Sequence, residues 1–275
     1  MTNVSGTFAQ PFAAFATRFA MPANGNANYY YAWSYGPAFF VSFDSEGDFS
    51  AGSAQIAWLD ATLASVDRSV FPWVFLSLHH PVLSSDSDEA GDHIPGGAKS
   101  LVLSPILKKY KVDCVFQGHQ HNYERTAAVY AATGEVVALP DAQNVYTDPA
   151  APVYIVQATA GAVLDYEKWI APTNWSLVRD GDNYGFGMMT LNSTADGTHR
   201  VLSYTFIDID NKVHVRILSR APAPRPSLRA RPLPSSCAAF AHPTAGHVVH
   251  RQDRVKAQGC RDVGGEGEGP ASLAL

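Results

Sequence analysis

Histidines follow two apolar segments of the sequence, and they are the residue type best suited to chemistry here. Trp73–Leu78 runs directly into His79, and Val112–Phe116 is followed closely by His119 and His121. Neutral imidazole is the commonest metal ligand in proteins, and the glycine before His119 permits a tight turn that aims the rings at i and i+2 into one cavity. A single histidine is more often a structural polar residue than a ligand. Three of them behind two strands favour a metal site.

The elements that must position these histidines follow a strand, helix, strand order. An apolar run at Ala38–Phe43 precedes a helical pattern that begins at Ser53, a suitable N-cap, and Trp73–Leu78 follows it. A second helical pattern at Leu101–Tyr110 leads into Val112–Phe116. In an open α/β sheet, ligands bind beyond the carboxyl ends of the strands. We therefore expect the histidines to share one edge of the sheet.

Later apolar runs have no clear helices between them. They read as strands near Val153–Gln157, Phe186–Leu191, Val201–Ile207 and Val213–Leu218. This order predicts an α/β part followed by a second packed sheet.

The composition changes after about Ser219. The remaining sequence is rich in Pro, Ala and Arg and then in Gly and Glu, so it offers too little apolar surface for a core. We predict a domain at 1–219 and a low-complexity, disordered tail at 220–275. The cysteines form no disulfide framework, and Cys114, in an apolar run, is predicted to be a core residue.

The overall charge restricts the partners that the chain can have. Its net charge is −5 and its pI is about 6.0, which argues against binding nucleic acid or anionic lipid. No apolar run is long enough to span a membrane, and no signal peptide is evident at the N-terminus. Glycosylation patterns at Asn3, Asn174 and Asn192 nevertheless suggest a secretory history, so the localisation and the oligomeric state stay open.

The run Gly118–Arg125, which reads GHQHNYER, resembles the G-H-x-H-x-Y-E-R signature of purple acid phosphatases, within the calcineurin-like metallophosphoesterase superfamily. Leu78–Pro81 is similar to the family's upstream metal-binding histidine with its following proline, and the likeness extends over roughly residues 12–209. The resemblance implies the C-terminal part of a four-layer αββα sandwich that lacks its N-terminal strands. It also implies an acid phosphatase that hydrolyses phosphomonoesters and is secreted or vacuolar/lysosomal.

The resemblance further implies a binuclear metal centre, with Fe beside Zn, Mn or a second Fe. In it, His79 and His119 would bind the divalent metal and His121 the ferric ion, whereas His80 is a weaker candidate. His93 lies where the family places a histidine that contacts the substrate phosphate, although a solvated loop histidine is equally compatible. Asp92 and Asp113 read as turn and surface residues.

Four further ligands of the family do not appear in this sequence, which has no D-x-G, G-D-x-x-Y and G-N-H motifs in the required order. We therefore expect a metal-dependent phosphoric monoester hydrolase that is impaired, with at most a partial site such as one Zn²⁺. An alternative is a catalytically silent protein that acts by binding a metal or a partner. A sugar- or protein-binding β-sandwich would explain the later strands but not the paired histidines.

Overall fold

The computed structural model describes residues 13–26, 28–88, 90–164, 168–193, 200–210, 213–220 and 271–274. The chain divides into two compact units, and every described element belongs to the first, Met1–Pro224 with Pro270–Leu275. The second unit, Arg225–Gly269, lies outside the described residues. Most of the tail predicted at 220–275 therefore also lies outside them.

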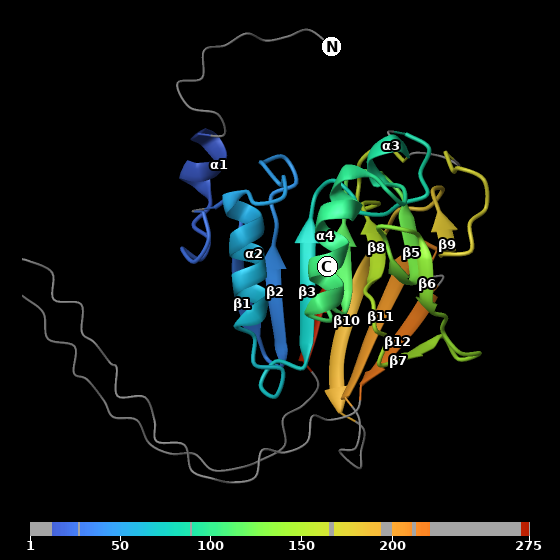
Figure 1. Ribbon diagram of the computed structural model, residues 1–275. Coiled ribbons are helices and arrows are strands. Elements are labelled where there is room, and N and C mark those ends of the chain that lie inside the picture. Colours follow the sequence, from blue (N-terminus) through green and yellow to red (C-terminus); the bar gives the residue numbers. More distant parts are fainter. Residues whose placement is uncertain are drawn as a thin grey trace, which may run out of the picture. The chain divides into compact units, whose positions relative to one another are not determined.

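The first sheet carries the histidine loops. Its strand order is β1-β2-β3-β4-β8-β5-β6, and β9 also pairs with β5. Strands β2, β3, β4 and β8 are parallel, so their carboxyl ends lie at one edge (Figure 1). The bounds are β1 (Tyr31–Tyr35), β2 (Ala38–Ser42), β3 (Trp73–Leu78), β4 (Cys114–Gln117), β5 (Tyr123–Tyr130), β6 (Glu135–Ala138), β8 (Val153–Gln157) and β9 (Ser176–Asp180).

Two helices connect the parallel strands in the predicted order. Helix α2 (Ala54–Ala64) joins β2 to β3, and α4 (Ala98–Lys109) joins β3 to β4. The Ser53 hydroxyl accepts a hydrogen bond from the Ile56 N–H at 3.3 Å, which confirms the predicted N-cap. A short helix, α3 (Ala90–His93), precedes α4 within the same connection, and another, α1 (Ala13–Arg18), precedes β1.

The second sheet has the order β13-β10-β11-β12-β7. It contains three of the four later runs predicted as strands, whereas the fourth, Val153–Gln157, is β8 of the first sheet. The bounds are β7 (Val145–Thr147), β10 (Gly185–Ser193), β11 (Arg200–Asp208), β12 (Val213–Arg220) and β13 (Ala271–Ala274). Strand β13 pairs with β10 in antiparallel fashion, although the composition predicts no strand in this part of the sequence.

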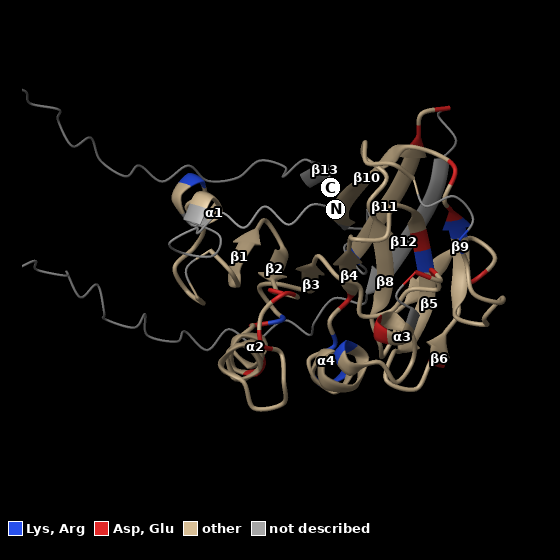
Figure 2. Cartoon of the chain, turned by 90° about the horizontal axis from the view of Figure 1, so that it is seen from above, with Lys and Arg blue, Asp and Glu red and all other residues tan. Residues whose placement is uncertain are grey.

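Alternating side chains of the first sheet build two separate cores, because successive residues of a strand face opposite sides. In β3, Val74 and Leu76 pack with Leu59 of α2 and Leu103 of α4. Phe75, between them, packs instead with residues of the second sheet. Figure 2 shows α2 and α4 on one side of the first sheet and β10–β12 on the other. These are three layers of the predicted αββα sandwich.

Two predictions about single residues near the sheet have different outcomes. Cys114 is fully buried with a free thiol, as expected for a core residue. Asp113, predicted to be a surface residue, is only 2% exposed. Its carboxylate accepts hydrogen bonds from the Arg68 guanidinium at 3.0 Å and the Val74 N–H at 2.8 Å, and these bonds allow the charge to be buried.

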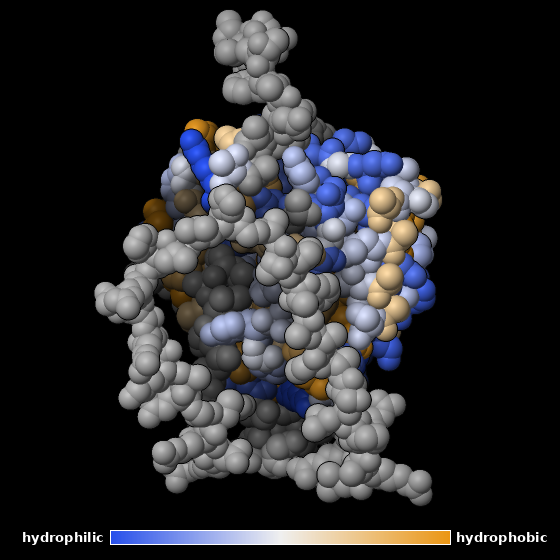
Figure 3. Space-filling view, turned by 90° about the vertical axis from the view of Figure 1, so that its left-hand side faces the viewer, coloured by the Kyte–Doolittle hydropathy of each residue, from blue (hydrophilic) through white to orange (hydrophobic). Residues whose placement is uncertain are grey.

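The surface is mixed in character. Figure 3 shows hydrophobic residues scattered among hydrophilic ones on one side of the molecule. Exposed large hydrophobic residues include Phe15, Phe19 and Tyr35, and the last of these is 51% exposed. Among the described residues, no helix is both long enough and apolar enough to cross a membrane.

Candidate metal site at the ends of three parallel strands

Three neighbouring parallel strands deliver polar residues to the same edge of the first sheet. Ser45 and Glu46 follow β2, His79 and His80 follow β3, and His119 follows β4. The His80 N–H donates to the Ser45 hydroxyl at 2.9 Å, and the backbone N–H of the residue before His119 donates to the His79 carbonyl at 2.9 Å. The three loops are therefore tied to one another and not only to their own strands.

Three imidazoles gather where these loops meet. The His79 Nε2 and His119 Nδ1 atoms lie 3.3 Å apart. The ring centroid of His79 is 5.1 Å from the centroid of His80 and 5.1 Å from that of His119. The centroids of His80 and His119 are 3.8 Å apart. One ligand atom from each of the three lies within 4.8 Å of the others. The predicted convergence thus holds for His79 and His119, with His80 as the third ring.

His119 occupies an unusual backbone conformation. Its φ is +68°, in the left-handed region that non-glycine residues seldom adopt. Such a conformation costs about 1–3 kcal/mol and persists only where the surrounding structure enforces it. Strain of this kind gathers at functional sites, so the backbone at His119 is consistent with a ring held for binding.

His80 makes a contact that the sequence does not reveal. Its Nε2 lies 2.8 Å from the Glu46 carboxylate, and the side chains are 22% and 55% exposed. Glu46 is 34 positions earlier in the chain (80 − 46 = 34), so no local motif links it to the histidine. Only the parallel pairing of β2 with β3 brings the two loops together.

His121, predicted to be a metal ligand, takes a different position. Its Nδ1 is 2.7 Å from the carbonyl oxygen of Val163, in the loop after β8. Within the described part of the chain, His121 does not belong to the group whose ligand atoms lie within 4.8 Å. His121 thus lies outside the three-ring group, and its expected role as the ligand of a second, ferric ion stays a prediction.

His93, predicted to be a catalytic residue in an open loop, is the last residue of α3 and is only 1% exposed. Its Nε2 lies 3.1 Å from the Asp86 carbonyl oxygen, and its own carbonyl accepts from the Ser84 N–H at 2.8 Å. A ring buried in this way cannot reach a substrate in solvent without rearrangement. In this geometry His93 supports the loop between β3 and α3.

Buried polar side chains hold the loop that follows His80. Glu124, 0% exposed on β5, accepts hydrogen bonds from the Ser84 and Ser85 hydroxyls at 2.8 and 2.5 Å and from the Ser176 hydroxyl at 2.5 Å. Its Oε2 also accepts the Ser85 N–H at 2.8 Å. Gln117, on β4, accepts the Val82 N–H at 2.7 Å. These side chains anchor the loop that carries His79 and His80.

The electrostatics of the cluster favour neutral imidazole at His79. Burial lowers the pKa of His79 from its ordinary value of 6.5, and repulsion from His119 and His80 lowers it further, while Glu46 opposes the shift. A neutral ring presents a lone pair to a metal, whereas a protonated ring does not. The lowered pKa of His79 therefore favours the form of the ring that can bind a metal.

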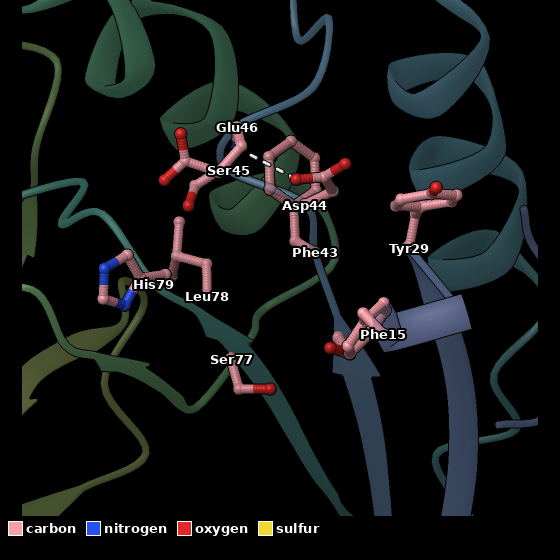
Figure 4. Close-up of a pocket in the computed structure, with 10 residues that line it drawn as sticks. Phe15, Tyr29, Phe43, Asp44, Ser45, Glu46, Ser77, Leu78 and His79 are labelled. Atoms are coloured by element: carbon pink, nitrogen blue, oxygen red, sulfur yellow. Dashed lines mark hydrogen bonds between the residues drawn. The ribbon is translucent and has the colours of Figure 1, made fainter. Parts of the chain in front are cut away.

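A pocket of about 470 Å³ opens beside His79. Figure 4 shows His79, Ser45 and Glu46 on one side of it and the rings of Phe15 and Tyr29 on the other. The Glu46 N–H donates to the Asp44 carboxylate at 2.9 Å, drawn as a dashed line. His79 thus lies at the border of a space large enough for a small molecule.

The donor chemistry of the cluster fits one borderline divalent ion such as Zn²⁺. Imidazole nitrogen suits Zn and related transition metals, whereas Mg²⁺ and Ca²⁺ prefer oxygen ligands. No carboxylate belongs to the group of ligand atoms within 4.8 Å in the described residues. The set therefore does not fit a ferric ion, which needs anionic ligands.

Comparisons with known proteins show the family that the chain resembles. The family model described as calcineurin-like phosphoesterase matches residues 8–123, and the one described as iron/zinc purple acid phosphatase-like protein C matches residues 151–214. The structure of a purple acid phosphatase from yellow lupin (Lupinus luteus) seeds is similar, with a TM-score of 0.62 and 30% identity. The likeness covers 75% of this chain and 35% of the lupin chain.

Among the relatives is the probable inactive purple acid phosphatase 27 of Arabidopsis thaliana, which is 34% identical over 63% of this chain and 28% of its own length. The acid phosphatase type 7 of Mus musculus is 30% identical over 74% of this chain and 48% of its own length. The chain thus spans between about a quarter and a half of the length of these relatives.

Proposed function

Because the chain belongs to the purple acid phosphatase family of calcineurin-like phosphoesterases, we propose that it is a metal-dependent phosphoric monoester hydrolase. We further propose that the 275-residue chain, by itself, is much slower than a complete family member. The observation that supports the first part is the imidazole cluster of His79, His80 and His119, of which His79 lines a pocket.

The residues present can account for binding and orientation. His79 and His119 offer Nε2 and Nδ1 at 3.3 Å from each other, and a backbone hydrogen bond between their loops keeps them together. The pocket beside His79 has room for a phosphomonoester, which is the substrate class we propose. When bound, a divalent metal supplies Lewis acidity toward a phosphoryl oxygen and lowers the pKa of coordinated water.

The proposal of low activity follows from what the cluster lacks. Phosphoryl transfer in two-metal sites relies on a symmetric clamp of both the attacking and the leaving oxygen. A bridging carboxylate is what holds two cations close together, and the cluster among the described residues is made of imidazoles alone. Three neutral rings can hold one ion but do not neutralise two.

A catalytically silent protein is the second candidate. Three of the relatives carry names that include the words probable inactive, and they are 34–37% identical to this chain. A metal-binding fold of this kind would act through its bound ion or through a partner. Its distinguishing result would be metal binding without turnover.

The test is a phosphatase assay on recombinant protein with the printed sequence, using p-nitrophenyl phosphate at pH 5 with added Zn²⁺. We expect slow, Zn²⁺-dependent hydrolysis that His119→Ala abolishes, at a rate at least about 100-fold below complete family members, since loss of about 2.7 kcal/mol of charge stabilisation has that effect. A matched surface variant, Lys109→Ala, should keep the wild-type rate. Hydrolysis that survives His119→Ala would exclude the cluster as the active site.

A further inference from the structure

The contact between His80 and Glu46 has the geometry by which proteins orient a metal-binding histidine. The His80 Nε2 lies 2.8 Å from the Glu46 Oε1, so the ring proton is placed on Nε2 and the lone pair on Nδ1. Ligating histidines in general donate their second ring nitrogen to a carboxylate, a carbonyl or water. A hydrogen bond to a glutamate that is 55% exposed contributes little to stability, so the fold itself does not require this contact.

The spacing of His79 and His119 matches two ligands of a tetrahedral ion. Two nitrogens each about 2.0–2.1 Å from Zn²⁺ at the tetrahedral angle are about 3.3–3.4 Å apart. The His79 Nε2 and His119 Nδ1 atoms are 3.3 Å apart. His80 offers a third ligand atom within 4.8 Å of both, a distance that rotation of one exposed side chain can shorten.

The backbone supports these three rings independently of the side-chain contacts. The His80 N–H is bonded to the Ser45 hydroxyl, and Ser45 immediately precedes Glu46. The carboxylate and the imidazole that it orients are thus carried by two loops joined at the adjacent residue. The left-handed backbone at His119 fixes the remaining ring from the other side of the cluster.

From this geometry we infer that His80, oriented by Glu46, is the third ligand of a single-ion site with His79 and His119, and that His121 is not a ligand of that ion. Imidazole donors with an open fourth position select Zn²⁺ and similar transition ions over Mg²⁺ and Ca²⁺. The inference rests on the proposed metal-dependent function for its biological meaning. It concerns binding, however, and is tested without turnover.

The experiment is a Zn²⁺ titration of the purified metal-free chain against a competing coloured chelator. Wild type should bind one equivalent. His80→Ala should weaken the affinity by about 100-fold or more, and Glu46→Gln by about 10-fold, the lower end of the usual effect of removing an orienting partner. His121→Ala should change it by less than about threefold. Glu135→Gln, an exposed glutamate on β6, is the matched control for Glu46→Gln and should leave the affinity unchanged.

Two results would overturn the inference: an unchanged affinity in His80→Ala, or a larger loss in His121→Ala than in His80→Ala. Thermal unfolding of each metal-free variant separates loss of a ligand from loss of the fold, and a variant that melts near wild type is interpretable. Tight Zn²⁺ binding without phosphatase activity would leave this site in place and reject the proposed function. Zn²⁺-dependent hydrolysis that His80→Ala leaves unaffected would support the proposed function and reject His80 as a ligand.

Discussion

Polar residues near the carboxyl edge of the first sheet fall into two groups with opposite surroundings. His79, His80 and His119 lie at or near the surface and contact mainly one another and Glu46. Glu124 is fully buried and accepts four hydrogen bonds from three serines, two in the loop after β3 and one on β9. The comparison indicates that the first group is available for a ligand, whereas the second group holds the loops in place.

Removal of the Glu124 carboxylate should have the largest effect on stability. Glu124→Leu leaves the Ser84, Ser85 and Ser176 hydroxyls and one backbone N–H without their acceptor in a buried site. We expect a loss of about 3–5 kcal/mol in the free energy of unfolding, measured by urea denaturation. Glu124→Gln, which keeps one acceptor oxygen, should lose about half as much. A loss in His80→Ala as large as that in Glu124→Leu would remove the distinction between the two groups.

Asp113 immediately precedes β4, at the end of the strand away from His119. It tests whether another buried charge behaves like Glu124. Asp113→Ala removes the acceptor of the Arg68 guanidinium and of the Val74 N–H, and we expect it to cost about 2–3 kcal/mol. The matched control is Asp60→Ala, which breaks the exposed pair with Lys109 and should leave the unfolding midpoint unchanged. Equal shifts in both variants would show that burial does not set the difference.

At His119 we expect the opposite relation, in which the conformation that serves metal binding lowers the stability of the fold. His119→Gly relieves the left-handed backbone at φ +68°, and we expect a gain of about 1 kcal/mol in the free energy of unfolding together with loss of Zn²⁺ binding. His119→Ala, which keeps the strain, should lose binding without that gain. A glycine variant less stable than the alanine variant would contradict the assignment of strain.

Tyr154 should show the smallest effect at neutral pH. Burial raises the pKa of its hydroxyl far above the ordinary value of 10. Since the folded state holds this proton more tightly than the unfolded state, the contribution is complete below pH 10 and is lost as the pH rises above 10. Tyr154→Phe should therefore flatten the decline in stability between about pH 10 and 12. An identical alkaline decline in the variant would assign it to other groups.

The sequence predicts the parallel strands and their helices closely, because their apolar periodicity is strong. The run at Trp73–Leu78 is strand β3 without adjustment. Strand β5 (Tyr123–Tyr130) is missed, since its first half carries the polar residues Glu124, Arg125 and Thr126, which interrupt an apolar pattern although they are buried. Periodicity reports apolar burial only, so a buried polar strand gives no signal.

The site, too, could be predicted only where a sequence pattern specifies the position of a residue. Pairing of parallel strand ends predicts that His79 and His119 meet, and they do. Glu46 could not be predicted, because it is exposed, far from His80 in the chain, and brought near by a loop whose path no local pattern specifies. His93 is placed wrongly in the open because a single histidine carries no information about which face of a loop it occupies.

The pairing of β13 with β10 has a consequence for how the chain is synthesised. Strand β10 ends at Ser193 and its partner begins at Ala271, 78 residues later (271 − 193 = 78). At a translation rate of about 5–20 residues per second, the partner strand emerges roughly 4–16 s after β10. During that interval the N–H and C=O groups along this edge of β10 have no partner strand. An unpaired edge of this kind can pair with another nascent chain unless a chaperone covers it.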